Sequence, residues 1–506
     1  MSAAELKQKV AAALAQRDYA LAEHLCREAE GRVPPGDVLF IRGVVASTQG
    51  KAAEALKLLR AAYDQSPNRA DIAFNYGVVL QQSGDLGGAS DAWRRAVDLD
   101  PKNAAAWSNL ALATVKLSGD EAALGVYARA LTHHPDHRDL LYNAGNAAYR
   151  RGDFAGSERF LDALVRRHPN DALGWTNLGL AQKAQDRRSE AEASYRRAIA
   201  LGPEAAKPRA YYNLANLLLQ NGQWREGFAA YEWRLKLPGA PAAPWSLPSW
   251  SPALPEGGRV LLWNDQGLGD GIMYLRFVPL LAERGYKPFV FVQASLKSLA
   301  ATVAGVEGVF EPNDAPAPID AALPLCSLPY ALGLETIDMW TGPYVRAPAK
   351  SPVVLERKGK RAGLVWAGNA AHDNDTNRSA SLEALASLFD LPGYEWFSLQ
   401  LGPRVRELQS SFPVRDLSAH LTDLSASAAI LSQLDVLVSV DTAPAHLAGA
   451  LGKRVCTLLP AVGTDWRWGR EGAGTFWYPS MRLYRQRQAG DWSQPVSALA
   501  DDLRAA

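Results

Sequence analysis

The chain has 506 residues, and its 54 basic and 53 acidic side chains leave a net charge of +1. That balance gives no support for a nucleic-acid partner or an anionic membrane surface. The length suits about three domains, and the three distant cysteines, Cys26, Cys326 and Cys456, fit neither a disulfide framework nor a zinc site. The N-terminus has no signal-peptide core, and no apolar run is long enough to span a bilayer, so we expect a cytoplasmic protein without a membrane span.

A 34-residue period organises the first half of the chain, which is the period of tetratricopeptide repeats. Prolines keep this spacing at Pro67, Pro101, Pro135, Pro169 and Pro203. Small residues keep the same phase in the first helix of each repeat, at Gly43, Gly77, Ala111, Gly145 and Gly179. Bulky residues recur in the second helix, and glycines fall at the turns, at Gly50, Gly84, Gly119 and Gly152. We therefore predict an α-solenoid of seven repeats over residues 1–237.

One position of the first helix carries an asparagine in five consecutive repeats, at Asn75, Asn109, Asn143, Asn177 and Asn213. We expect these amides to line the concave groove as a ladder for peptide binding, because an amide both donates to and accepts from any peptide backbone. Hydrogen bonds between helices and a solvated polar face are the alternatives. The ladder resembles that of the O-linked N-acetylglucosamine transferases, whose asparagines hold extended polypeptide, and this favours a protein partner. The sequence leaves open whether a second copy of the chain fills part of the groove as a homo-oligomer.

Two further features of this region need an interpretation. His133, His134 and His137 surround Pro135, but no carboxylate or thiol spacing completes a metal site there, so we interpret them as surface residues of a turn. Residues 238–258 are rich in proline and contain Trp245 and Trp250. The prolines forbid a regular helix and the tryptophans indicate packing, so we predict a linker that packs against its neighbours.

Residues 259–350 follow the pattern of an α/β half-domain. A strand at 260–263 is followed by a Gly-Leu-Gly turn and a helix that begins near Asp270. The turn lacks the third glycine of a dinucleotide fingerprint, so NAD binding is not expected. Asp270 has two interpretations. It caps the helix, or its carboxylate faces a cleft and takes a proton from an acceptor hydroxyl.

Residues 351–506 contain a second α/β half. A strand over 361–369 ends in the small residues Gly368 and Asn369, and a strand over 394–399 ends at Gln400. Arg378 precedes a predicted helix, where it is suited to hold a diphosphate or carboxylate. Its alternative role is that of a surface arginine.

The most informative stretch lies at 434–460. Two apolar runs, 436–440 and 455–459, are short and rich in β-branched residues, which is typical of buried parallel strands. Between them, Asp441 and Thr442 precede a helix in which Ala443 lets a ligand approach the backbone and His446 lies one turn on. Helix N-termini at the carboxyl ends of such strands bind phosphate. We therefore predict a nucleotide-binding turn.

These motifs carry a resemblance that covers nearly the whole chain. RVLLWNDQGLGD, GLVWAGN, VSVDTAPAHLAGALGKRV and DWRWGREG are similar to a bacterial family that joins tetratricopeptide repeats to a heptosyltransferase-like domain of the GT-B glycosyltransferase fold. The resemblance implies two Rossmann-like halves, with the acceptor side at 259–350 and the donor side at 351–506.

In heptosyltransferases the first GD motif supplies the proposed base, which corresponds to Asp270. Their DTGxxH motif binds the donor nucleotide and its phosphates. This motif corresponds to Asp441, Thr442, Ala443 and His446, and the cation in a loop of the heptosyltransferase donor half corresponds to Arg378. With the residues at neighbouring strand ends, the resemblance implies donor binding by Gly368, Asn369, Arg378, Gln400, Asp441, Thr442, Ala443 and His446. The chain departs from the heptosyltransferase pattern at Ala443, where they have glycine, and near Gln400, where they have an acidic residue. Both departures argue against their ADP-sugar preference.

The resemblance implies a metal-independent glycosyltransferase with no bound cofactor and a nucleotide sugar as co-substrate. The family that the chain resembles includes flagellin glycosyltransferases that use CMP-linked nonulosonic acids. We therefore expect protein O-glycosylation, with flagellin as the acceptor and CMP favoured as the nucleotide. Arg467, Arg470 and Arg485 in the tail either serve an acidic sugar or fasten the tail to the core. We expect the last helix, 495–505, to pack across the first half. The alternatives are a lipid or polysaccharide acceptor, and a non-catalytic adaptor or chaperone.

Overall fold

The computed structural model describes residues 1–204, 206–314, 318–337, 340–372, 374–408 and 412–505. The chain forms two compact units, Met1–Lys207 and Pro208–Ala506. The repeat pattern places a boundary near residue 237, so the observed division falls one helical hairpin earlier than the sequence suggests.

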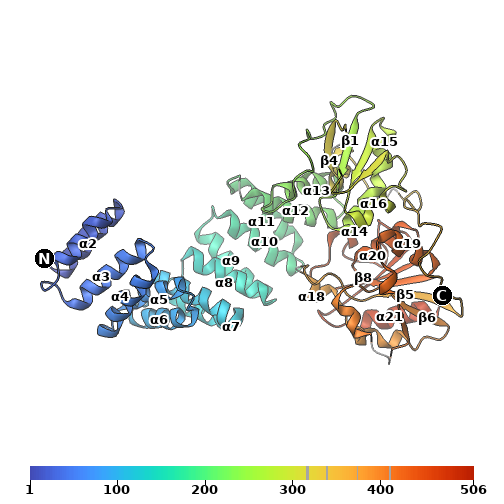
Figure 1. The fold of residues 1–506 in the computed structure, drawn as a ribbon. Coiled ribbons are helices and arrows are strands. Elements are labelled where there is room, and N and C mark those ends of the chain that lie inside the picture. Colours follow the sequence, from blue (N-terminus) through green and yellow to red (C-terminus); the bar gives the residue numbers. More distant parts are fainter. Residues whose placement is uncertain (205, 315–317, 338–339, 373, 409–411, 506) are drawn as a thin grey trace. The chain divides into compact units, whose positions relative to one another are not determined.

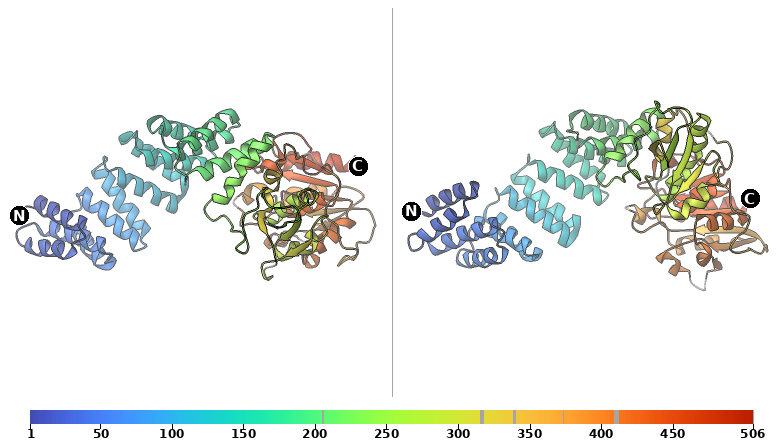
Figure 2. Two further views of the ribbon diagram at one scale, coloured as in Figure 1. Left: turned by 90° about the horizontal axis from the view of Figure 1, so that it is seen from above. Right: turned by 45° about the horizontal axis from the view of Figure 1, so that its top comes forward.

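The first unit is a stack of helical hairpins, which follow one another in Figures 1 and 2. The helices described in it are α1 (Ala3–Ala15), α2 (Tyr19–Glu28), α3 (Pro35–Thr48), α4 (Ala52–Gln65), α5 (Ala70–Gln82), α6 (Leu86–Leu99), α7 (Ala104–His133), α8 (Arg138–Arg150), α9 (Phe154–Arg167), α10 (Ala172–Ala184) and α11 (Arg188–Leu201). Helix α7 comprises both helices of one repeat, and non-helical backbone at Gly119 marks where the first ends and the second begins. The predicted α-solenoid is confirmed.

The small positions of the first helices allow close packing on the second helices. A Cβ added at Gly43 would lie 2.7 Å from Leu59, and one added at Gly77 would lie 2.6 Å from Trp93. Such distances are shorter than van der Waals contact, so a larger residue would separate the two helices. The turn glycines also behave as predicted, since Gly84 has a φ of 89°, which disfavours other residues.

The seventh hairpin belongs to the second unit. It consists of α12 (Lys207–Gln220) and α13 (Trp224–Tyr231), followed by the 3-10 turn η1 (Glu232–Lys236). Phe228 and Tyr231 share one apolar cluster with side chains of the α/β region. Nε of Arg234 lies 2.8 Å from Oδ2 of Asp265 in a buried ion pair. These long-range contacts tie the hairpin to the α/β region.

The first α/β half has a parallel sheet of strand order β3-β2-β1-β4. Its elements are β1 (Arg259–Trp263), α14 (Leu268–Tyr274), η2 (Leu275–Phe277), α15 (Val278–Glu283), β2 (Lys287–Phe291), α16 (Ala294–Ala300), β3 (Gly308–Phe310), β4 (Ala321–Pro324), η3 (Leu325–Ser327) and α17 (Leu328–Ala331). The proline-rich linker packs on this sheet, as predicted. The N–H of Trp250 donates to the carbonyl of Ala322 at 2.8 Å, and the ring of Trp245 contacts Phe310 edge-on at 5.4 Å.

The second half has a parallel sheet of order β10-β9-β8-β5-β6-β7. Its elements are β5 (Lys360–Val365), α18 (Asp375–Arg378), η4 (Glu383–Leu388), β6 (Tyr394–Ser398), η5 (Pro403–Glu407), β7 (Val414–Asp416), η6 (Ser418–His420), α19 (Leu424–Gln433), β8 (Val436–Val440), α20 (Ala443–Ala450), β9 (Val455–Leu459), η7 (Trp466–Trp468), β10 (Met481–Arg485) and α21 (Ser493–Arg504). Strands β8 and β9 are buried along their whole length, as the apolar runs predict. The right-hand view of Figure 2 shows the two halves as two lobes, a layout consistent with GT-B.

The terminal helix α21 departs from the sequence prediction, which placed it across the first half. It packs instead on the second half, against η4, β9 and β10. Tyr394 Oη donates to the carbonyl of Leu503 at 2.9 Å, and Tyr484 Oη donates to Asp502 at 2.7 Å. The apolar face of α21 covers that sheet, and so the helix completes the core of its own half.

Candidate active site

Two strand–turn–helix units in the α/β region carry the predicted motifs. In the first, β1 leads to α14, and Oδ2 of Asp270 accepts a hydrogen bond from the N–H of Gly267 at 3.0 Å. In the second, β8 leads to α20, with Thr442 at the N-cap and Pro444 in the first turn. Asp270 therefore caps its helix, as one of its two interpretations predicts. A further role depends on what else its carboxylate contacts.

Helices α14 and α20 pack against each other and lie side by side in Figure 1. The contact is close because Gly269 has no side chain. A Cβ added there would lie 2.8 Å from Cδ2 of His446, whose side chain is buried. The glycine turn of the first half therefore touches the histidine of the second half, and the two predicted motifs meet at one place.

The Asp270 carboxylate forms an ion pair with the guanidinium of Arg467, which also pairs with Oδ2 of Asp465 at 2.6 Å. The Asp270 side chain keeps 20% of its surface exposed. Burial raises the pKa of Asp270 above its ordinary value, although the positive charge of Arg467 opposes the rise. A carboxylate with a raised pKa and some exposure is suited to accepting a proton.

Asp441 has a different environment. Its Oδ1 lies 3.7 Å from Nε2 of His446, and Nδ1 of the same ring lies 3.1 Å from the hydroxyl of Tyr478. The His446 ring stacks on Trp468 with 5.1 Å between centroids. Burial acts to raise the pKa of Asp441, but the electrostatic interaction with the nearby His446 ring outweighs burial and the pKa is lowered. Asp441 therefore stays ionised at neutral pH and holds His446 in place.

Arg378 joins two strand ends of the second sheet. Its Nη1 donates to the carbonyl of Asp441 at 3.3 Å, and its Nε donates to Asp375 at 3.3 Å. Gly368, just past β5, leaves the space for this guanidinium, since a Cβ there would lie 2.5 Å from Nη2. With 14% of its side chain exposed, Arg378 is not a freely solvated surface arginine. Gly368, Arg378 and Asp441 are thus brought together.

The remaining predicted donor residues differ in how accessible their polar groups are. Gln400 is buried. Its Oε1 accepts a hydrogen bond from the backbone N–H of Ala367 at 2.9 Å, and its Nε2 donates to the carbonyl of Ala367 at 3.0 Å. The hydroxyl of Thr442 lies 2.9 Å from that of Ser439. Asn369 is exposed and accepts from the N–H two residues on. Ala443 begins α20 beside Thr442. Direct donor contacts by these residues stay predictions.

The tail arginines serve two different purposes. Arg485 donates to the backbone carbonyls of Trp468, Gly469 and Gly472, so it fastens the tail loop, as one interpretation of the sequence predicts. Arg467 instead reaches the first half at Asp270. Sequence reasoning missed this pairing and the contact of Tyr478 with His446. The density of arginine and aromatic residues at 465–485 was the available signal.

The asparagines of the predicted ladder each lie on the first helix of their hairpin, as expected. Asn177 donates to Oδ1 of Asn146 in the preceding repeat at 2.7 Å, and Asn75 donates to the carbonyl of Asp71 at 2.8 Å. Hydrogen bonding between helices therefore occurs at Asn177. Nδ2 of Asn213, in the second unit, is buried and has no hydrogen-bond partner among the described residues. Peptide binding by the ladder stays a prediction.

The histidines around Pro135 have structural contacts of their own. Nε2 of His134 lies 3.1 Å from the carbonyl of Pro101, Nδ1 of His137 accepts from the N–H of Leu140 at 3.4 Å, and His133 stacks on Trp107. Across the described ranges, no group of three or more histidine, cysteine or acidic residues is arranged to hold a metal ion. In the same ranges, every helix is too short or too polar to cross a membrane.

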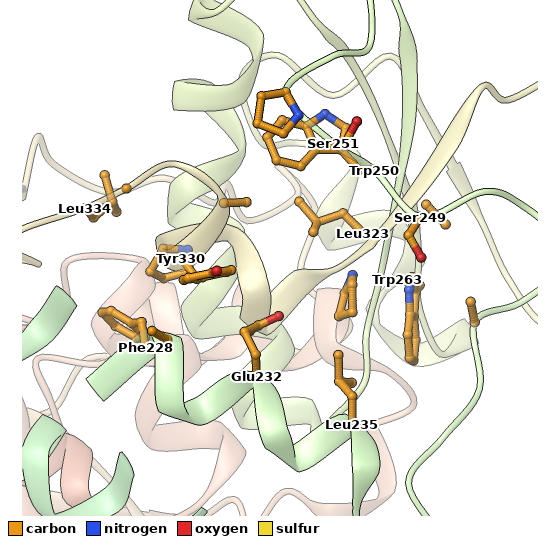
Figure 3. A pocket seen from close by; sticks show the side chains of 18 of the residues that line it. Phe228, Glu232, Leu235, Ser249, Trp250, Ser251, Trp263, Leu323, Tyr330 and Leu334 are labelled. Atoms are coloured by element: carbon orange, nitrogen blue, oxygen red, sulfur yellow. The ribbon is translucent and has the colours of Figure 1, made fainter. Parts of the chain in front are cut away.

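A cavity of about 730 Å³ lies where the seventh hairpin, the linker and the first sheet meet (Figure 3). Its lining includes Phe228, Trp250, Trp263, Leu323 and Tyr330. None of the predicted site residues is among the described side chains that line it. The cavity is therefore separate from the motif pair around Asp270.

Comparison with known families supports both parts of the chain. Tetratricopeptide repeat models match residues 46–113 and, in a second form, residues 8–70, 121–172 and 176–240. A model described as glycosyltransferase family 9 (heptosyltransferase) matches residues 404–461, which include β8, the DTAPAH turn and β9. The resemblance that the sequence motifs carry is confirmed.

Individual relatives cover the chain to different extents. Protein FlbA of Caulobacter vibrioides is 24% identical over 537 residues, which is 96% of this chain and 87% of that protein. Protein O-mannosyl-transferase TMTC3 of Homo sapiens is 26% identical over 222 residues, 41% of this chain and 24% of that protein. Among solved structures, MamA matches 33% of the chain at 19% identity with a TM-score of 0.31. The C-terminal part of a repeat protein from Cytophaga hutchinsonii matches 46% at 18% identity with a TM-score of 0.40.

Proposed function

We propose that this chain, which joins tetratricopeptide repeats to a heptosyltransferase-like glycosyltransferase domain, transfers a sugar from a nucleotide donor to a Ser or Thr hydroxyl of a protein held by the repeats. One observation carries the proposal. The turn with Asp270 and the turn with Asp441 follow strands of two different sheets, and Gly269 and His446 bring them into contact. An acceptor and a donor can thus be bound by opposite halves of one site.

In the proposed reaction, the acceptor oxygen attacks the anomeric carbon of the donor sugar. The bond from that carbon to the donor phosphate oxygen breaks, and the nucleotide leaves with the electron pair. The proton of the acceptor hydroxyl moves to the carboxylate of Asp270, which its raised pKa favours. Each half of the site then supplies one substrate.

The donor phosphates meet positive charge on the second half. Arg378 lies at the Asp441 strand end, and His446 lies one turn into α20. The N-terminus of α20 adds its dipole, and its first residue, Ala443, lets a phosphate approach the backbone. These groups balance the charge of the leaving phosphate without a bound metal ion. The departures from the heptosyltransferase pattern at Gln400 and Ala443 argue against an ADP-sugar donor, and the resemblance to flagellin glycosyltransferases favours CMP.

The repeats supply the acceptor in this proposal. Tetratricopeptide repeats form protein-binding surfaces, and the name of TMTC3 describes an enzyme that glycosylates protein. The family resemblance points to flagellin as the acceptor and to a CMP-linked nonulosonic acid as the donor.

The test is the intact mass of flagellin produced with this chain, without it, and with Asp270→Asn, in cells that make a CMP-linked nonulosonic acid. We expect one or more added nonulosonate residues on Ser or Thr with the wild-type chain. Neither control should show the addition. Unmodified flagellin beside a folded, expressed wild-type chain would reject the proposed acceptor, and equal modification by Asp270→Asn would reject the proposed base.

A lipid or polysaccharide acceptor is the second candidate, because the matching family model is described as heptosyltransferase. It predicts unmodified flagellin and a glycolipid or polysaccharide that disappears when the chain is deleted. Calorimetry with CMP and ADP separates both candidates from a non-catalytic adaptor, which should bind neither nucleotide.

A further inference from the structure

A short turn after β9 connects three parts of the second unit. The turn is η7 (Trp466–Trp468), and the Asp465 carboxylate caps it by accepting from the N–H of Arg467 at 3.0 Å. Arg485 on β10 holds the other side of the turn by donating to the carbonyl of Trp468. The backbone of η7 is therefore fixed at both ends.

Three consecutive side chains of η7 contact three different neighbours. The ring of Trp466 contacts Phe228 of α13 edge-on at 6.1 Å between centroids. Arg467 pairs with Asp270 of α14, and the ring of Trp468 stacks on His446 of α20 at 5.1 Å. The turn thus fixes Arg467 between the seventh hairpin and the two motif helices.

The guanidinium of Arg467 is held on several sides. Its side chain is 10% exposed, and it pairs with Asp270 and with Asp465. It also lies 5.1 Å from the centre of the Trp466 ring. An arginine held this way lies in one place when the acceptor arrives and loses little entropy in keeping its partner oriented.

We propose that Arg467 is a positioning residue for Asp270, which it keeps ionised and oriented for proton transfer. This inference rests on the proposed function, because it requires Asp270 to be the base. Loss of a purely structural ion pair would also change the proton affinity of Asp270 and the stability of the fold. A positioning role differs in one measurable way, because loss of Arg467 then also moves the pH dependence of the transfer reaction.

The charges around Asp270 support this role. Burial raises its pKa, and the positive groups that act against the rise are Arg467 and, more weakly, His446. The acidic groups Asp465 and Asp265 act in the direction of burial. Tyr212, Tyr274 and Cys326 also interact with Asp270. Arg467 is thus the main group that keeps the carboxylate ionised.

A first experiment measures Asp270 directly and needs no substrate. The full chain is labelled with a water-soluble carbodiimide and an amine at roughly pH 5 to 8, and the peptide that contains Asp270 is quantified by mass spectrometry. Labelling rises with protonation, so we expect Arg467→Gln to label about tenfold faster than wild type near neutral pH, an effect equal to about one pKa unit. Arg467→Lys, which keeps a cation, should fall between the two. Arg482→Gln serves as the matched control, because Arg482 pairs with Asp502 on the outside of β10.

Equal labelling of Asp270 in wild type, Arg467→Gln and Arg467→Lys would overturn the inference. Arg467→Lys keeps the test decisive if Arg467→Gln does not fold. The result is also independent of the acceptor. If Asp270 labels faster in Arg467→Gln but the wild-type chain leaves flagellin unmodified, the effect of Arg467 on Asp270 stands and the proposed function is rejected. If labelling is unchanged in Arg467→Gln but the wild-type chain modifies flagellin, the proposed function stands and the inference about Arg467 is rejected.

A second experiment uses the reaction itself. With purified flagellin and a CMP-linked nonulosonic acid, we expect the acidic limb of the kcat/KM profile to move to higher pH in Arg467→Gln, because the base must be ionised to accept a proton. Arg467→Lys should recover part of the shift. A rate that falls by the same factor at every pH in Arg467→Gln would mean a structural role only, and would overturn the inference.

Discussion

The two strand–turn–helix units of the site have the same local design and opposite electrostatics. Each places a short helix after a buried parallel strand, with a small residue, Gly269 or Ala443, at the start of the helix. Each carries an aspartate whose side chain is 20% exposed, Asp270 or Asp441. The pKa of Asp270 is raised and that of Asp441 is lowered.

The difference comes from the partners of each carboxylate, since exposure is the same. Asp441 faces His446, and the electrostatic interaction with that ring outweighs the effect of burial on its pKa. Asp270 faces Arg467, but Asp465 shares the arginine, and burial prevails. One fold element therefore yields a carboxylate that can take up a proton and another that stays an ionised hydrogen-bond acceptor. We assign the chemistry to the first and donor binding to the second.

The largest expected effect is that of Asp270→Asn on transfer. An amide cannot take a proton from the acceptor, so we expect the transfer rate to fall by about 10²–10⁴-fold while CMP binding is unchanged. Initial rates of flagellin modification and calorimetry with CMP measure the two quantities. A variant that keeps its rate, or one that loses CMP binding, would remove the contrast between the two aspartates.

Gly269→Ala tests the contact that joins the two units. The added methyl group meets Cδ2 of His446 at 2.8 Å, and that ring is held between Trp468 and Tyr478, so it has no room to move. We expect the free energy of unfolding to fall by about 1–3 kcal/mol. Gly125→Ala is the matched control, because its methyl meets no atom within 4 Å. It should leave stability unchanged or raise it by about 0.5–1 kcal/mol. Equal effects of the two substitutions would contradict the close packing of α14 on α20.

Asp441→Asn probes the donor side. The substitution keeps the shape of the side chain but removes the charge that orients His446. We expect CMP affinity to fall by about tenfold, the effect of losing one charge-assisted interaction of about 1.4 kcal/mol. Binding of unglycosylated flagellin should not change. Calorimetry with each ligand gives both values, and an unaltered CMP affinity would exclude Asp441 from the donor site.

The local sequence pattern was enough to predict the secondary structure of both strand–turn–helix units. Strands β8 and β9, the helix between them and the glycine turn before Asp270 follow from apolar runs and capping residues. The repeat phase likewise predicts which glycines face bulky side chains, as Gly77 faces Trp93. These features depend on residues that are close in the sequence or on one fixed period.

Contacts between distant segments could not be predicted in this way. The seventh hairpin matches the repeat pattern, but the buried pair of Arg234 and Asp265 joins it to the α/β region across 31 positions. The pair of Arg467 and Asp270 spans 197 positions, and no spacing rule connects them. The last helix has an amphipathic pattern that fits either half, and tertiary packing selects the second. Sequence thus predicted both aspartates and His446 beside Asp441, but not Arg467, the partner of Asp270.

The smallest expected effect is on stability, and its sign differs between the two aspartates. A lowered folded-state pKa means that ionised Asp441 adds stability above its unfolded pKa near 3.8, and that this stability is lost as the pH falls. A raised pKa means that ionised Asp270 costs stability at neutral pH, and that the cost disappears as the carboxyl protonates. At neutral pH we therefore expect Asp441→Asn to lower Tm and Asp270→Asn to raise it, each by about 1–3 °C. The Asp270→Asn difference should shrink toward roughly pH 4, whereas the Asp441→Asn difference should persist there and shrink only below the unfolded pKa of 3.8. Thermal unfolding at the two pH values measures them, and shifts of the same sign would refute the electrostatic contrast between the two units.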